Sequence, residues 1–199
     1  WPALDVSLKG KRIGLMLDLG FGDRLEGDVR ATVTAAARAF ESAGASVRDV
    51  SGVMTRETLD GLDAFWRARS WDDLSRMPPE VRAKALPYIY QWAEGGAKLS
   101  GVDVVRGFNA TMTIRAAAAQ LFADLDYVIS PVSPVVKFAA ENAAPGNDPQ
   151  KPFEHIVYTV PWNMAENPAA SINGGYDVDG FPIGVQIIGR RFDDLGVLR

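Results

Sequence analysis

One histidine and no cysteine limit the chemistry that this chain can perform. Cysteine is absent from all 199 residues, which excludes a thiolate nucleophile, a disulfide framework and a cysteine-ligated zinc site. His155 is the only side chain that could act as the base of a Ser-His-Asp triad, but the sequence has no G-x-S-x-G turn for a nucleophile. A single histidine also excludes a histidine-pair metal motif. We therefore predict that His155 is a surface or helix-terminal residue and that no metal is bound.

Three further patterns could carry chemistry but are better explained by structure. The D-x-D-G sequence at 177–180 is similar to the start of a calcium loop, but the downstream glutamate is missing, so a β-turn is predicted. The G-x-G sequence at 20–22 follows a strand but lacks the third glycine of a dinucleotide fingerprint, which predicts another turn. Arg115 lies on a predicted helix and either pairs with a carboxylate within the fold or faces a cleft; the structural role is favoured. Taken alone, these residues form no catalytic constellation.

Composition and charge exclude several classes of partner. Of the residues, 47% are hydrophobic and 23% are charged, which is typical of a globular domain with a sizeable core. The net charge is -4 and the basic residues are spread along the chain, so no nucleic-acid partner is expected. No apolar run approaches the roughly 20 residues that span a bilayer, and no signal peptide is visible. We expect a cytoplasmic protein without a membrane partner.

The N-terminal quarter predicts a βαβ unit. The apolar run at 12–19 suits a strand that is buried on both faces. From Asp28 onwards, apolar residues recur at helical spacing until Gly44, and glycine is common just after the end of a helix. Residues 46–50 alternate and predict a second strand. The short joints between these elements indicate that the two strands pair in parallel.

The rest of the chain is mostly helical and then changes to strands. Residues 55–125 are predicted to be largely helical, and the helix at 104–125 is apolar on two faces, which is typical of a helix packed between two layers. A short strand at 126–130 leads into a proline-rich loop at 131–152, and loops of that length are often functional. A strand, a turn and a strand follow over 169–188.

Three ordered motifs in the last third of the chain resemble the amidase signature family. VISPVSP at 128–134 resembles the family's DVLLTPTTP strand and loop. YTVPWNMAENPAASI at 158–172 looks like FTxPxNxTGxPAxSVP, and GFPIGVQIIGRRFDD at 180–194 looks like GLPVGLQIIGRRFDD. LKGKRIGL at 8–15, followed by DVR at 28–30, resembles the middle of the same family's sequence. The resemblance spans almost the whole chain, although its second quarter is generic.

The resemblance implies an α/β fold with a mixed β-sheet sandwiched between helices, of which this chain would be an incomplete part. The family hydrolyses or transfers amides through a Ser, cis-Ser, Lys triad, whose nucleophile lies in a Gly/Ser-rich segment of the N-terminal half. No such segment is present here, and neither the serines nor the lysines match a catalytic position. We therefore assign no catalytic residue to this chain, and we expect no cofactor.

The resemblance also implies where a substrate would bind. The proline turn after the 126–130 strand and the loop at 163–168 would lie near the substrate cleft. The helix arginine lies where some family members place an arginine that meets the substrate's carboxylate. The sequence departs from the pattern at Ala165-Glu166, where a small Thr-Gly pair is common, and the glutamate would narrow or acidify the loop. The implied substrate-binding residues are Arg115, Val132, Ser133, Asn163 and Asn167.

These observations predict that residues 1–199 are the C-terminal part of a single amidase domain that is cut at both ends, because the chain starts at Trp1 without methionine and stops at Arg199 inside an expected helix. It would supply scaffold and pocket for a small-molecule amide, while an upstream half of the same protein supplies the serine and lysine. Alone, the chain would be inactive, and its open sheet edges and uncovered apolar faces would make it associate, for example as a homo-oligomer. Two alternatives stay open: a non-catalytic relic or binding module on the same fold, and a transamidase subunit that feeds ammonia to a partner.

Overall fold

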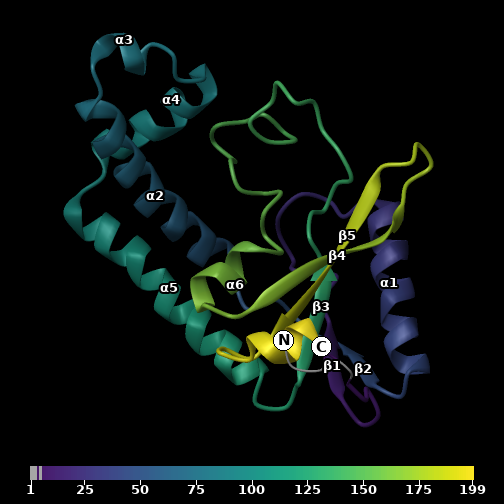
Figure 1. Cartoon of the computed structure of the whole chain (residues 1–199). Helices are drawn as coiled ribbons and strands as arrows, with labels where there is room; N and C mark the ends of the chain where they lie inside the picture. The colour runs from purple at the N-terminus through teal and green to yellow at the C-terminus, as the bar shows by residue number, and fades with distance from the viewer. Residues whose placement is uncertain (1–3, 5) are drawn as a thin grey trace.

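The computed structural model describes residue 4 and residues 6–199, which form a five-stranded mixed sheet with helices on both faces (Figure 1). Trp1, from which a cut N-terminal end was predicted, lies outside the described residues. The strands follow the order β2-β1-β3-β5-β4 in the sheet; β1 pairs in parallel with β2 and β3, whereas β5 runs antiparallel to β3 and β4. The predicted α/β class with a mixed sheet is confirmed. The strands are β1 (Arg12–Leu15), β2 (Ser46–Asp49), β3 (Tyr127–Pro131), β4 (Ala169–Tyr176) and β5 (Pro182–Gly189).

One helix follows β1, a group of helices lies between β2 and β3, and two short helices come later, one before β4 and one after β5. Pro79 and Pro87 each occupy a first-turn position, where proline costs no hydrogen bond, so they begin helices instead of bending them. The α-helices are α1 (Gly27–Ser42), α2 (Arg56–Arg76), α3 (Pro79–Arg82), α4 (Pro87–Glu94), α5 (Gly101–Leu121), α6 (Val160–Ala165) and α7 (Asp194–Leu198), and a 3-10 helix, η1 (Gly95–Lys98), lies between α4 and α5.

Strand alternation gives the sheet two apolar faces with different helices on them. Ile13 and Ile129 point to one face, where they pack with Val33 of α1. Val128 and Ile188 point to the other face and pack with residues of α2, α5 and α6. The predicted βαβ unit is confirmed, although β1 ends at Leu15 instead of residue 19. Beyond that point the chain leaves the ladder after one more bond, from the Met16 amide to the Ile129 carbonyl.

Helix α5 is apolar on two faces, as predicted, but only one of them is covered within the described part of the chain. Gly107, Ala110, Ile114 and Ala118 are buried on the face of α5 that packs on α2 and α6. The prediction that the helix is sandwiched between layers is therefore wrong for this chain, because its second face stays largely exposed among the described residues. The exposed apolar residues of that face are Val102, Val105, Phe108 and Met112, each between 47% and 58% exposed.

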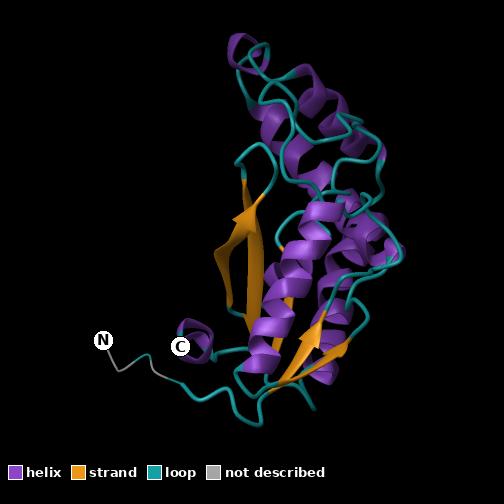
Figure 2. Cartoon of the chain, turned by 90° about the vertical axis from the view of Figure 1, so that its right-hand side faces the viewer, coloured by secondary structure: helices purple, strands orange, loops and turns teal. Residues whose placement is uncertain are grey.

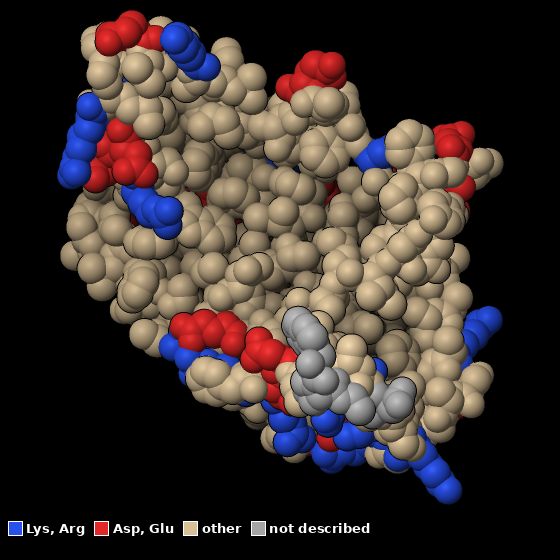
Figure 3. All heavy atoms as spheres, in the orientation of Figure 1, with Lys and Arg blue, Asp and Glu red and all other residues tan. Residues whose placement is uncertain are grey.

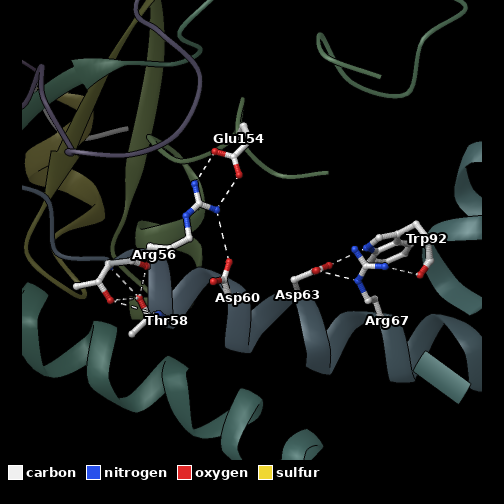
Figure 4. Close-up of polar contacts among 8 residues, drawn as sticks. Arg56, Thr58, Asp60, Asp63, Arg67, Trp92 and Glu154 are labelled. Carbon is white, nitrogen blue, oxygen red and sulfur yellow. Dashed lines mark hydrogen bonds and ion pairs between the residues drawn. The ribbon is translucent and has the colours of Figure 1, made fainter. Parts of the chain in front are cut away.

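Helix α2 holds the long connection between β3 and α6 in place (Figure 4). Arg56 donates two hydrogen bonds, of 2.7 and 2.6 Å, to the carboxylate of Glu154. Further along the helix, Asp63 accepts from Arg67 and from the Trp92 indole, at 2.8 and 2.7 Å. Arg67 also donates to the Pro149 carbonyl at 2.8 Å. The predicted loop at 131–152 thus exists, extends to residue 159, and is ordered by these contacts.

Strands β4 and β5 form the predicted hairpin at one side of the sheet. Figure 2 shows them as long arrows at the side of the molecule, with most of the helices lying to one side of them. β5 is largely buried, but almost every residue of β4 is exposed or partly exposed, and β4 is the last strand in the order of the sheet. A long, exposed edge strand is a surface that another segment can pair with.

Candidate functional site

The face that carries β4, α5 and α6 is hollowed. Figure 3 shows a broad depression between the helices α2 and α5, the long loop and the β4–β5 hairpin, and its floor is mostly uncharged. Charged side chains gather along the rim, including the part below α6, where the helix leads into β4 (Figures 1 and 3). All of the sequence-predicted site residues lie on or beside the elements that frame this depression.

Arg115 of α5 is paired with a carboxylate from the loop after α6. Its Nη2 atom donates to Glu166 Oε1 at 2.6 Å. The other carboxylate oxygen of Glu166, Oε2, accepts from Nη2 of Arg191, which follows β5. Two guanidinium groups from distant parts of the sequence therefore converge on one carboxylate. The Nε atom of Arg115 is buried and has no hydrogen-bond partner among the described residues.

Glu166 has an unusual backbone conformation for a glutamate. It caps the C-terminus of α6 with φ 61° and ψ 36°, in the left-handed region that glycine adopts most easily. A left-handed cap ends the helix and turns the chain towards β4, with the Glu166 amide donating to the Asn163 carbonyl. Position 166 belongs to the Ala165-Glu166 pair, where the sequence analysis noted that a small Thr-Gly pair is common. Here the Glu166 carboxylate bridges Arg115 and Arg191.

The two predicted asparagines lie on either side of this glutamate. Asn163 is exposed on α6, and its side-chain amide donates to the Thr159 carbonyl at 3.0 Å. Asn167 donates from Nδ2 to the Gly189 carbonyl at 2.8 Å and so ties the α6–β4 loop to the end of β5. Arg115, Asn163 and Asn167 are thus gathered around the C-terminus of α6.

Val132 and Ser133 lie elsewhere, beyond the carboxyl end of β3. The Ser133 hydroxyl donates to the Val135 carbonyl at 2.8 Å and accepts from the Val135 amide, so it shapes a local turn. Val132 packs against Gly184, where an added Cβ would come within 2.7 Å of its side chain. Asn167 bonds to Gly189, which pairs with Tyr127 at the start of β3. Val132 and Ser133 follow the other end of this strand, so they lie about 15 Å from the residues around α6.

The central serine of the sheet is part of a buried polar network that the sequence analysis did not anticipate. Ser130 Oγ accepts from Gln186 Nε2 at 3.0 Å and donates to the Pro131 carbonyl. Gln186 Nε2 also donates to the Tyr158 carbonyl, and the Tyr158 hydroxyl donates to the Leu17 carbonyl at 2.9 Å. Burial raises the pKa of the Tyr158 hydroxyl. Ser130 has no base beside it in the described structure, so this network joins strands instead of activating a nucleophile. The sequence did contain a signal for this network, because Ser130 and Gln186 are polar residues within otherwise apolar strand sequences.

The prediction that His155 is a surface or helix-terminal residue is wrong. His155 is half-buried in the long loop. Its ring packs edge-on against Phe138 with a centroid distance of 6.0 Å. The Nδ1 atom is buried without a hydrogen-bond partner in the part of the chain that the structure describes. Burial lowers the pKa of the imidazole, and the nearby Asp23 carboxylate opposes this effect. Since no serine hydroxyl bonds to this ring among the described residues, no triad is formed.

The remaining patterns take the structures that the sequence predicted. The D-x-D-G sequence is a turn in which Asp177 Oδ1 accepts from the amides of Asp179 and Phe181. The G-x-G sequence is also a turn, with positive φ values of 75° at Gly20 and 92° at Gly22.

A cavity of about 840 Å³ opens next to this turn, at the carboxyl ends of β1 and β2, a place where α/β proteins often bind ligands. No group of three or more potential metal-ligating side chains occurs within residue 4 and residues 6–199.

Comparison with known proteins decides the family. The model of the amidase family matches residues 2–198, which is nearly the whole chain. This chain belongs to the amidase signature family. Among curated proteins, the A subunit of glutamyl-tRNA(Gln) amidotransferase from Brevibacillus brevis is 31% identical over 222 aligned positions, and the corresponding protein from Prochlorococcus marinus is 28% identical over 221. Each alignment covers 99% of this chain but only 44% and 45% of the relative, so the chain spans less than half the length of these relatives.

Solved structures of amidase signature enzymes share this fold. A bacterial aryl acylamidase aligns with 98% of this chain and 43% of its own, with a TM-score of 0.78 and 25% identity. A 6-aminohexanoate cyclic dimer hydrolase aligns with a TM-score of 0.77 over 98% of this chain and 45% of its own, at 19% identity. No helix in the described residues is both long and apolar enough to cross a membrane.

Proposed function

We propose that this amidase signature chain is the scaffold and pocket part of an amide hydrolase, with the catalytic serine and lysine in the remainder of the protein. The match to the amidase family over nearly the whole chain is the observation that carries the proposal. It is supported by the surroundings of the only buried serine among the described residues, Ser130, whose hydroxyl contacts an amide and a carbonyl but no base there. An unactivated hydroxyl is a weak nucleophile.

The substrate is a small-molecule amide, and water takes up the acyl group. The C–N bond breaks, the acid retains the hydroxyl of water, and ammonia or an amine leaves with the proton. We assign the pocket wall to Arg115, Asn163 and Asn167 around α6, with Val132 and Ser133 at a second position beyond β3. No cofactor is needed for this reaction. The protein acts in the cytoplasm, alone or as a homo-oligomer.

The test is the release of ammonia or aryl amine by the protein encoded by the whole reading frame. We expect the whole protein to hydrolyse simple aliphatic or aryl amides and residues 1–199 alone to release nothing above background. Hydrolysis by the isolated 199-residue chain would overturn the assignment of the catalytic groups to the remainder. A whole protein that hydrolyses no amide would favour the alternative of a non-catalytic relic or binding module.

A second candidate is a transamidase subunit, and the names of the curated relatives favour it. The relatives at 31% and 28% identity are subunits of glutamyl-tRNA(Gln) amidotransferases. Such a component would deliver ammonia to an acceptor bound by a partner instead of releasing it to water. Amide cleavage that occurs only when co-purifying partner proteins are present would support this candidate, whereas full activity of the purified protein favours the hydrolase.

A further inference from the structure

The cluster formed by Arg115, Glu166 and Arg191 has the geometry of an occupied anion site. Two guanidinium groups approach one carboxylate from different elements, α5 and the segment after β5. Arginine is common where proteins bind carboxylates, because its planar guanidinium offers several donors in a fixed fork. Within the described residues the cluster is only partly covered, because the side chains of Arg115, Glu166 and Arg191 are 33%, 50% and 39% exposed. A free carboxylate could therefore reach the two arginines if Glu166 were absent.

The backbone of Glu166 indicates that its carboxylate has a specific role. Its left-handed conformation suits glycine, and a glutamate there is strained by its own Cβ. The two charge-assisted contacts offset this strain. The buried Nε atom of Arg115 has no partner within the described residues, so Glu166 does not satisfy all of the donors that the site offers.

We propose that Glu166 fills a two-arginine anion site at the rim of the substrate hollow and thereby restricts the enzyme to acyl groups that carry no carboxylate at this end. This rests on the proposed amide hydrolase function. The floor of the hollow is mostly uncharged and the charged side chains lie at its rim (Figure 3). Within the cluster one negative and two positive charges are present, and an incoming carboxylate would have to displace Glu166 from both arginines.

The experiment uses the whole protein, three variants and a control. Glu166→Gly removes the carboxylate and suits the left-handed backbone, so folding is retained. Glu166→Gln keeps the side-chain shape without the charge. The double variant Glu166→Gly with Arg115→Gln removes one of the two arginines as well. Glu41→Gln, an exposed glutamate of α1, on the opposite face of the sheet from α6, is the matched control.

Two measurements are made on each protein. The first is kcat/KM for succinamate and for its methyl ester, which differ by one charge. The second is the binding of glutarate by calorimetric titration, which requires no activity. For Glu166→Gly we expect about a 10- to 100-fold gain in kcat/KM for succinamate relative to its ester, mainly through KM, because charge-assisted hydrogen bonds are worth that much. Glutarate should bind Glu166→Gly at least about tenfold more tightly than the wild type.

The outcomes separate this inference from the proposed function. The gain should be smaller in Glu166→Gln, absent in the double variant and absent in Glu41→Gln. A wild type that accepts succinamate as well as its ester, or a Glu166→Gly variant that neither gains activity on succinamate nor binds glutarate, would overturn the inference while leaving amide hydrolysis intact. If no protein hydrolyses any amide, the proposed function fails, and glutarate binding alone decides whether Glu166 fills an anion site.

Discussion

At the scale of single residues, the structure places charges and buried polar atoms in positions that the sequence could not reveal. Glu166 meets Arg115, which is 51 positions away along the chain, and the meeting depends on how α6 packs on α5. The sequence did mark position 166 as a departure from the family pattern, but not which arginines it contacts. Likewise, Ser130 and Gln186 are recognised as partners only once β3 and β5 are paired.

His155 should make stability depend on pH. Burial lowers the pKa of this imidazole below its usual value of 6.5, so the folded state favours the neutral ring. Above about pH 6.5 both states are neutral and the stability is fully present; as pH falls below it, the unfolded chain takes up a proton more readily and stability is lost. Burial raises the pKa of the Asp23 carboxyl, so this group acts in the opposite sense and adds stability as pH falls.

The melting temperature of the whole protein should therefore fall between about pH 7.5 and pH 5.5, and His155→Phe should reduce this fall. The phenyl ring keeps the contact with Phe138 but cannot titrate. If the wild type and the variant lose the same number of degrees across this range, the histidine is not the responsible group.

At the scale of elements, local patterns identified most helices and strands, because periodicity and turn residues act over short distances. The βαβ unit and the β4–β5 hairpin followed from alternation and glycine-rich turns. The end of β1 was missed, since the apolar run to Leu19 continues after the ladder stops. The second face of α5 was correctly predicted to be apolar, but the described residues leave it largely exposed.

The contact between α2 and α5 requires glycine at position 107. A Cβ there would lie 2.2 Å from the carbonyl oxygen of Gly61, which is a backbone atom that cannot move aside. Gly107→Ala should destabilise the protein by roughly 2–3 kcal/mol in urea unfolding because the helices must separate. Gly101→Ala is the control, since its Cβ meets nothing within 4 Å, and alanine at this helix position should be neutral or slightly stabilising. Equal effects of the two substitutions would refute the close approach.

The long loop depends on the Asp63 and Arg67 pair of α2. These side chains are only 20% and 12% exposed, and Asp63 also accepts from the Trp92 indole. Asp63→Ala would leave both donors unsatisfied, so we expect a loss of about 2–4 kcal/mol and faster proteolysis within residues 138–152. Asp60→Ala, which removes an exposed partner of Arg56 on the same helix, should cost less than about 0.5 kcal/mol. A loop that stays protease-resistant in Asp63→Ala would contradict this role of the pair.

At the scale of the whole molecule, the described residues leave an apolar helix face and an unpaired strand edge exposed. The apolar face of α5 around Phe108 and the edge strand β4 both border the hollowed face. Contiguous exposed apolar surface and open strand edges usually mark an interface. Because the chain spans less than half the length of its curated relatives, we interpret this face as the place where the catalytic part of the protein packs.

The central claim is tested most directly by complementation of two separately produced polypeptides, residues 1–199 and the remainder of the same protein. We predict that neither hydrolyses an aryl amide alone, that the mixture does, and that Phe108→Asp on α5 abolishes recovery while Glu41→Gln does not. Amide hydrolysis by residues 1–199 alone, or by the remainder alone at the rate of the mixture, would contradict the account.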